Sequence, residues 1–268
     1  MSITQRVGRA VGRFKRRDQN PTGAMTLMEH LGELRTRLMI ALGAVALGAL
    51  IGWFLYDPVF HFLQKPYCEI IKEHPSMAVS PNAGCKFFFN SAVAPFLIKI
   101  KVVSFIGLAI ALPIVMYQVW RFITPGLTNN ERRYAIPFVT ASVLLFLLGA
   151  YFGIFTLPKA LNFLLGFAGT NTLVSALDVT KYMTFVFFMI LAFGLSFELP
   201  VILVSLCAAG VLSSQKLRKW RRGAMVGIAV FAAVITPTQD WFTMTAMMVP
   251  LLIFYEMSIL IARFVLKK

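Results

Sequence analysis

Carboxylate side chains are scarce in this sequence, with 11 Asp and Glu residues against 26 Lys and Arg, so their positions are informative. Glu29 and Glu33 lie about one helical turn apart in EHLGELRTRL, and Arg37 lies a further turn along. Glu131 begins the run ERR, where Asn130 can cap a helix. Because the planar guanidinium of arginine matches a carboxylate through two parallel hydrogen bonds, two separated glutamates could hold two adjacent arginines of a ligand. The alternative is that these acids only stabilise the positive ends of helices.

Glu198 lies within FGLSFELPVI, one of the most apolar parts of the chain. An ionised carboxylate in lipid is costly, so this side chain should face protein or a water-filled cavity, or be protonated. Pro200 follows and is expected to bend the helix. The alternative is a protonated glutamate bonded to a neighbouring helix, and proton carriage is a weaker hypothesis because a single carboxylate is no relay. Glu256, in the last apolar segment, is expected to pair with Arg263 or to face the bundle.

Motifs for catalysis are missing from the sequence. We find no HExxH, GxGxxG or phosphate-binding loop, and no GxSxG with a plausible triad. The histidines, His30, His61 and His74, are scattered without metal-ligand spacing. We therefore expect no catalytic residue, no metal and no cofactor, and a protein that acts by binding rather than as an enzyme.

The cysteines leave one question open. Cys68 and Cys85 fall in the same expected external loop, where an oxidising compartment permits a disulfide. Two free thiols are the equally weighted alternative. Cys207 is expected to be a buried thiol at the end of an apolar segment.

Composition predicts the class of protein that positions these residues. Of 268 residues, 58% are hydrophobic and only 14% are charged, which is typical of a membrane protein. A membrane span needs about 20 apolar residues. The sequence predicts an all-α integral membrane protein with six transmembrane helices, at about 38–56, 102–120, 135–156, 182–207, 223–236 and 242–264. The fifth is short, so a re-entrant hairpin made by the fifth and sixth segments is the alternative.

The net charge of +15 follows the expected topology. Most Lys and Arg residues precede the first span, lie between spans two and three or four and five, or end the chain, which assigns both termini to the cytoplasm. The charge therefore needs no nucleic acid. We expect one membrane domain, residues 25–268, after a basic cytoplasmic tail, residues 1–24. Prolines inside spans should bend them into a curved bundle with a concave face, namely Pro113, Pro137, Pro200 and Pro250.

Shorter signals predict local structure between the spans. PVFHFLQKP is expected to form a short interfacial helix that a turn at Pro66 ends, and PKALNFLLGF a second short helix. Asp178 or Thr180 could cap span four, and Asp240 span six. SSQKLRKWRR should be a serine-capped helix whose charge reflects topology, with a minor role in cargo or lipid contact as the alternative.

Four motifs in order resemble one known family. They are HLGELRTRL, PIVMYQVWRFITPGLTNNERR, FGLSFELPV and AAVITPTQDWFT. From about Met25 to its end, the chain resembles the TatC family, the membrane receptor subunit of the twin-arginine protein translocase. The resemblance implies a glove-shaped fold of six helices. It also implies recognition of the paired arginines of export signal peptides on folded cargo, in transport driven by the proton-motive force.

The resemblance also implies roles for particular residues. Glu33 and Glu131 correspond to the family's twin-arginine site, and Phe122 belongs to the same region. We add the adjoining Glu29 and Arg132 to this expected signal-peptide site. Glu198, Thr236 and Glu256 are the expected intramembrane polar residues that contact partners. Met244 stands where some members carry a polar side chain, so the polar cluster of the family is incomplete here.

The partners implied by the resemblance are single-span TatA-like and TatB-like subunits, with further copies of this chain and membrane lipid. The location implied is the bacterial cytoplasmic membrane. Two other functions stay open. A small secondary transporter would bind a coupling ion at Glu198, and a scaffold without a ligand would be indifferent to the loss of Glu33 and Glu131.

Overall fold

The computed structural model describes residues 27–73, 85, 87–123, 135–166, 178–238 and 240–266. This part of the chain is helical apart from turns and one isolated bridge between Phe88 and Asp178. In chain order the helices are α2 (Leu27–Phe54), α3 (Tyr56–Glu73), α4 (Ala94–Ile123), α5 (Ala135–Gly166), α6 (Val179–Ser196), α7 (Leu199–Ala208), α8 (Ser214–Lys219), α9 (Arg221–Ile235) and α10 (Trp241–Phe264). The predicted all-α class is confirmed.

Five segments of the described chain are long and apolar enough to cross a membrane, namely α2, α4, α5, α6 with α7, and α10. Each contains or overlaps one predicted span. The remaining predicted span is α9, whose 15 residues give about 22 Å of helix, less than the roughly 30 Å apolar core of a bilayer. It packs on α10, which is long enough to span, so that a sixth span at α9 and a re-entrant hairpin with α10 both stay predictions.

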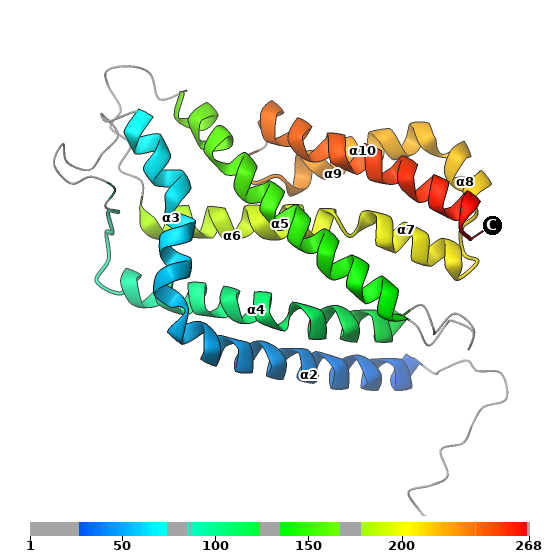
Figure 1. Cartoon of the computed structure of the whole chain (residues 1–268), viewed down its shortest axis with the longest axis horizontal. Coiled ribbons are helices and arrows are strands. Elements are labelled where there is room, and N and C mark those ends of the chain that lie inside the picture. The colour runs from blue at the N-terminus through cyan, green and yellow to red at the C-terminus, as the bar shows by residue number, and fades with distance from the viewer. Residues whose placement is uncertain are drawn as a thin grey trace, which may run out of the picture.

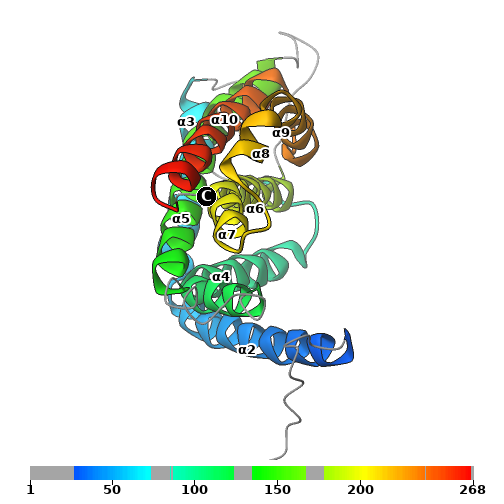
Figure 2. The same cartoon turned by 90° about the vertical axis from the view of Figure 1, so that its right-hand side faces the viewer.

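The long helices run roughly along one direction and alternate in sense, with α2 beside α4, and α5 crosses in front of α6 (Figure 1). Seen end-on, they form a curved array from α2 at one edge to α9 and α10 at the other (Figure 2). The segment of α6 and α7 is central, because 61% of its apolar window is buried against 11% for α2. Lipid is therefore expected to cover most of α2.

The contact between α2 and α4 depends on two glycines. A Cβ atom built on Gly48 would lie 2.6 Å from the carbonyl oxygen of Gly107, and one built on Gly107 would lie 2.6 Å from the amide nitrogen of Ala49. Small residues let transmembrane helices approach closely and gain dispersion contacts. These two helices form the most extensive helix pair of the structure.

The chain bends between α6 and α7 at Phe197 and Glu198, as predicted from Pro200. The proline occupies the first turn of α7, where its missing N–H needs no intrahelical partner. Pro137 likewise lies in the first turn of α5 and so breaks no intrahelical bond, and the prediction that it bends its helix is wrong. Pro113 and Pro250 lie inside α4 and α10.

Two expected loop features are wrong. Pro66 lies inside α3, which continues to Glu73, instead of ending a shorter helix. The predicted second short helix is the continuation of α5 through Pro158 to Gly166. In both helices a proline removes one backbone bond, and α3 and α5 pack against each other here, so tertiary contact compensates for the loss.

The expected helix caps are confirmed. Asp178 accepts bonds from the amides of Thr180 (2.8 Å) and Lys181 (3.2 Å) at the start of α6. Asp240 accepts from the amide of Thr243 at 2.8 Å, and Ser213 from that of Lys216 at 3.3 Å. The sulfur atoms of Cys68 and Cys85 are bonded, with Cα atoms 5.2 Å apart, so α3 is tied to the segment before α4. Cys207 is a buried free thiol.

Candidate functional site

One end of the bundle brings the start of α2 against the end of α4. The rings of His30 and Phe122 stack with centroids 4.3 Å apart and an angle of 19° between their planes. The segment EHLGELR therefore lies beside the last turn of α4, from which the chain continues toward the run ERR. Helix α4 is anchored at this end because the Trp120 ring is buried and stacks on Phe138 of α5, with centroids 4.6 Å apart.

Glu33 is not a free carboxylate in this structure. Its Oε1 atom accepts a hydrogen bond from Nη2 of Arg37, one turn further along the same helix. The side chains of Glu33 and Arg37 are only 21% and 12% exposed. The second oxygen of Glu33, Oε2, and Nε of Arg37 are buried without a hydrogen-bond partner in the described chain. The pair thus holds the carboxylate in one orientation and leaves one buried oxygen without a hydrogen bond.

Other predicted members of this site lie outside the described residues. These are Glu131 and Arg132, together with the side chain of Glu29. The structure thus places Glu33 and Phe122 at one end of the bundle and gives no contact for the remaining three. It adds His30, which the sequence analysis did not include. The signal was present, because His30 and Glu33 are three residues apart and so share a helix face.

Glu198 lies at the bend between α6 and α7 with its side chain 8% exposed. It occupies the cap position of α7 but makes no capping bond with its side chain. The Ser142 side chain on α5 interacts with the carboxyl group, while Oε1 is buried without a partner in the described chain. The glutamate therefore faces protein, against a neighbouring helix, rather than lipid.

Thr236 and Glu256 lie at opposite ends of the pair formed by α9 and α10. Thr236 is 1% exposed, and its hydroxyl donates to the carbonyl of Ala232 at 2.9 Å. Glu256 accepts from Nη2 of Arg221 at 2.6 Å, and both side chains are nearly half exposed. The expected pairing of Glu256 with Arg263 is wrong, because the first turn of α9 brings Arg221 closer. Arg263 instead lies over the ring of Phe264.

The turn between α9 and α10 carries a hydrogen-bonded cluster around Asp240. Besides the amide of Thr243, its carboxylate accepts bonds from the hydroxyls of Thr243 (2.5 Å) and Thr238. Burial alone would raise the pKa of Asp240, but these hydrogen bonds outweigh it and lower the pKa below its usual value. All these bonds stay within the turn and the first turn of α10, which is the arrangement of a helix cap.

Chemically, the described side chains at the end formed by α2 and α4 can bind a cationic group. No group of three or more His, Cys, Asp and Glu residues in the described part of the chain could hold a metal ion. The end formed by α2 and α4 offers a carboxylate that Arg37 holds in place and, about one turn earlier on α2, the stacked rings of His30 and Phe122. A guanidinium can both donate hydrogen bonds to a carboxylate oxygen and stack on an aromatic face.

Comparison with known proteins places the chain in a family. The model for TatC, described as Sec-independent protein translocase protein, matches residues 29–250. The protein of that name from Aquifex aeolicus is 39% identical over 246 residues, which cover 91% of this chain and 97% of the relative. The Escherichia coli protein is 35% identical, with 90% of each chain covered. The Frankia casuarinae protein is 42% identical over 88% of this chain, which spans only 65% of that relative.

Solved structures agree with the sequence comparisons. A crystal structure of a twin arginine translocase receptor, TatC, in the detergent DDM matches with a TM-score of 0.70 and 38% identity. The match covers 87% of this chain and 99% of the other. A second crystal structure of that receptor matches with a TM-score of 0.67. The chain therefore belongs to the TatC family of Sec-independent protein translocase proteins, and it is an all-helical integral membrane protein whose fold matches that of the solved TatC receptor structures.

Proposed function

We propose that this protein is the receptor subunit of a twin-arginine translocase and binds the paired arginines of export signal peptides on folded cargo. The observation that carries the proposal is the stack of His30 on Phe122, which joins the start of α2 to the end of α4. The motif HLGELR therefore lies at the same end of the bundle as the end of α4, after which the chain continues to the motif ERR. The similarity to crystal structures of a twin arginine translocase receptor supports the same function.

The geometry suggests how one arginine is recognised. Its guanidinium would donate to Oε2 of Glu33, the oxygen that Arg37 does not bond, after the side chains that bury this oxygen move aside, and it would lie near the rings of His30 and Phe122. The second arginine is assigned to Glu131, with Glu29 and Arg132 at the margin. A lysine offers a compact point charge without a planar fork, so it should bind less well at the same place.

Topology and partners complete the proposal. The start of α2, the end of α4, α8 and the end of α10 lie at one end of the bundle (Figure 1), and Lys and Arg residues gather on these segments. This asymmetry supports a cytoplasmic location for that end and both termini, in the bacterial cytoplasmic membrane. Single-span TatA-like and TatB-like subunits and further copies of this chain are the proposed partners, with Glu198, Thr236 and Glu256 as contact residues and the proton-motive force driving transport.

The test is binding of the purified full chain to a synthetic peptide that carries Arg-Arg before an apolar run. A Lys-Lys peptide is the ligand control. Glu33→Gln, Glu131→Gln and the double variant are compared with Glu69→Gln, which removes an exposed carboxylate from α3. We expect the Arg-Arg peptide to bind more tightly, each site variant to weaken it and Glu69→Gln to leave it unchanged.

Equal binding of both peptides, or unchanged binding by a double variant that stays folded, would show that the peptide binds through general affinity for membranes and not through the two glutamates. The scaffold alternative would then stand. An ion flux that Glu198→Gln abolishes would instead favour the transporter alternative.

A further inference from the structure

A groove on the opposite part of the bundle from α2 contains none of the residues assigned above to peptide recognition. Helices α7 and α9 both pack on α10 but make little direct contact with each other, so a space remains between them. One cavity there has a volume of about 360 Å³ and a second has about 270 Å³. Both are lined by Leu203, Ala224 and Tyr255, so they are two parts of one continuous groove, here called the α7–α9 groove.

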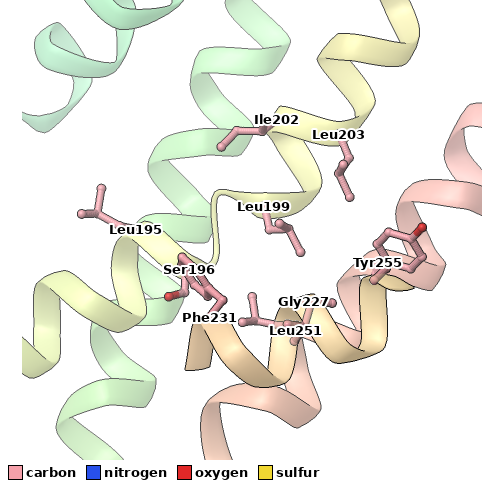
Figure 3. Close-up of a pocket in the computed structure, with 11 residues that line it drawn as sticks. Leu195, Ser196, Leu199, Ile202, Leu203, Gly227, Phe231, Leu251 and Tyr255 are labelled. Carbon is pink, nitrogen blue, oxygen red and sulfur yellow. The ribbon is translucent and has the colours of Figure 1, made fainter. Parts of the chain in front are cut away.

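The deeper part of the α7–α9 groove is apolar. Leu199 and Leu203 of α7 project toward the side where α9 and α10 carry Phe231, Leu251 and Tyr255 (Figure 3). The hydroxyl of Ser196, at the deep end, already donates to the carbonyl of Ala192 at 2.5 Å. No free polar group of this lining calls for water or a polar solute, so a hydrocarbon chain is the matching occupant.

Residues of α8 and α9 line the groove. On α9 the lining residues Ala224, Gly227, Ile228 and Phe231 lie at positions i, i+3, i+4 and i+7, which is one helix face. Lys216 of α8 and Trp220, which lies between α8 and α9, continue the lining at the near end. From Ala224 to Phe231 this face extends about 10 Å, which fits within one leaflet of roughly 15 Å of hydrocarbon. The stripe therefore passes from a basic end to an apolar depth.

The basic end of the groove is formed by Lys216. Its ammonium group lies 6.0 Å from the centre of the Trp220 ring, and it forms no ion pair with any carboxylate of the described chain. The nearby cation Arg221, in the first turn of α9, is by contrast paired with Glu256. The Tyr255 hydroxyl donates to the carbonyl of Leu217 at 2.8 Å, which fixes α8 over the groove mouth. An unpaired cation beside an interfacial tryptophan suits an anionic headgroup.

From these observations we infer that the α7–α9 groove binds one anionic phospholipid. An acyl chain lies between α7 and α9, and the phosphate lies at Lys216. Small residues on α9 keep the groove open. A Cβ atom on Gly223 or Gly227 would meet nothing within 4 Å, so the space beside them is not filled by the protein itself.

The test is a lipid titration of the full chain in a non-ionic detergent, followed by native mass spectrometry. Phosphatidylglycerol and phosphatidylcholine with identical acyl chains are compared, and inorganic phosphate is added as a competitor. We expect one bound lipid, with about fivefold preference for phosphatidylglycerol, the equivalent of about 1 kcal/mol per basic residue near an anionic lipid. Inorganic phosphate at the same concentration should not displace it.

Four variants distinguish the contribution of the lipid headgroup from that of the acyl chain. Lys216→Gln should remove the preference for phosphatidylglycerol, while Lys219→Gln, on the same helix but outside the groove, should keep it. Gly227→Leu should weaken both lipids by filling the chain site. Ile202→Trp narrows the groove from the α7 side and serves if Gly227→Leu does not fold. Thermal unfolding and binding of the Arg-Arg peptide show that each variant is intact.

Several results would overturn the inference. Equal losses in Lys216→Gln and Lys219→Gln would mean that the positive charge of α8 acts diffusely. Unchanged lipid binding in both Gly227→Leu and Ile202→Trp would place the lipid elsewhere. Displacement of the lipid by inorganic phosphate would show that the site binds phosphate without needing an acyl chain.

Discussion

Replacing Gly107 by alanine tests the close approach of α2 and α4, on which the proposed peptide site depends. The added Cβ atom would lie 2.6 Å from the amide nitrogen of Ala49 and 2.7 Å from the carbonyl oxygen of Val45. Both are backbone atoms, so no side chain can rotate away. To restore a contact of 3.4 Å, α2 must move by about 0.8 Å relative to α4. Overpacking of this kind costs about 1–3 kcal/mol.

A matched control removes the effect of helix propensity. Gly43 lies on α2, and a Cβ atom there would meet nothing within 4 Å. Both substitutions gain helix propensity of up to about 1 kcal/mol in a helix interior. The unfolding free energies of Gly43→Ala and Gly107→Ala should therefore differ by the packing term, about 1–3 kcal/mol, with Gly107→Ala the less stable.

The assay is thermal unfolding of the purified chain in detergent, with Arg-Arg peptide binding measured on the same samples. Gly107→Ala should unfold several degrees below Gly43→Ala and bind the peptide more weakly, because displacement of α2 separates His30 from Phe122. Equal unfolding temperatures would show that the helices are not this close in the protein. A lower unfolding temperature with unchanged peptide affinity would show that the stack is not needed for recognition.

Three further predictions concern the end of the bundle away from the proposed peptide site. Because the pKa of Asp240 is lowered on folding, its contribution to stability is present above about pH 4 and is lost as the pH falls through the lowered pKa. Asp240→Ala should lower the unfolding free energy by about 0.5–2 kcal/mol near neutral pH, and this free energy should then depend less on pH in the acid range. An unchanged pH dependence of the unfolding free energy would show that the cap does not contribute to acid unfolding. Reduction of the bond between Cys68 and Cys85, which are 17 residues apart, should lower the unfolding free energy by about 3 kcal/mol; a Cys68→Ser, Cys85→Ser variant should show the same loss and no further response to reductant. Tyr182→Phe removes a buried bond of 2.8 Å to the carbonyl of Leu63 and should cost about 1–3 kcal/mol in unfolding assays, whereas a cost near zero would mean that another donor, such as water, replaces the hydroxyl.

Local chemistry explains why much of this protein could be predicted from its sequence. Hydropathy over about 20 residues decides whether a segment can enter lipid, and that property needs no knowledge of its neighbours. A cap such as Asp178 or Ser213 bonds to an amide two or three residues away, so the sequence contains both partners. The pairing of Glu33 with Arg37 is equally local, since it lies within one helical turn.

Contacts between distant segments could only be decided by the tertiary structure. Glu256 pairs with Arg221 rather than Arg263 because α9 folds back on α10. The spacing of these residues along the chain does not show which of the two cations lies closer to Glu256. Pro66 and Pro158 stay inside helices because α3 and α5 pack together and compensate for the lost backbone bonds. The stack of His30 on Phe122 and the α7–α9 groove likewise exist only once helices far apart in sequence lie side by side. Sequence by itself thus determined which segments are apolar enough to cross a membrane, how several helices are capped and which family the chain resembles. Packing decided which side chains meet, because a side chain's partner across helices depends on the position and rotation of the helix that carries it.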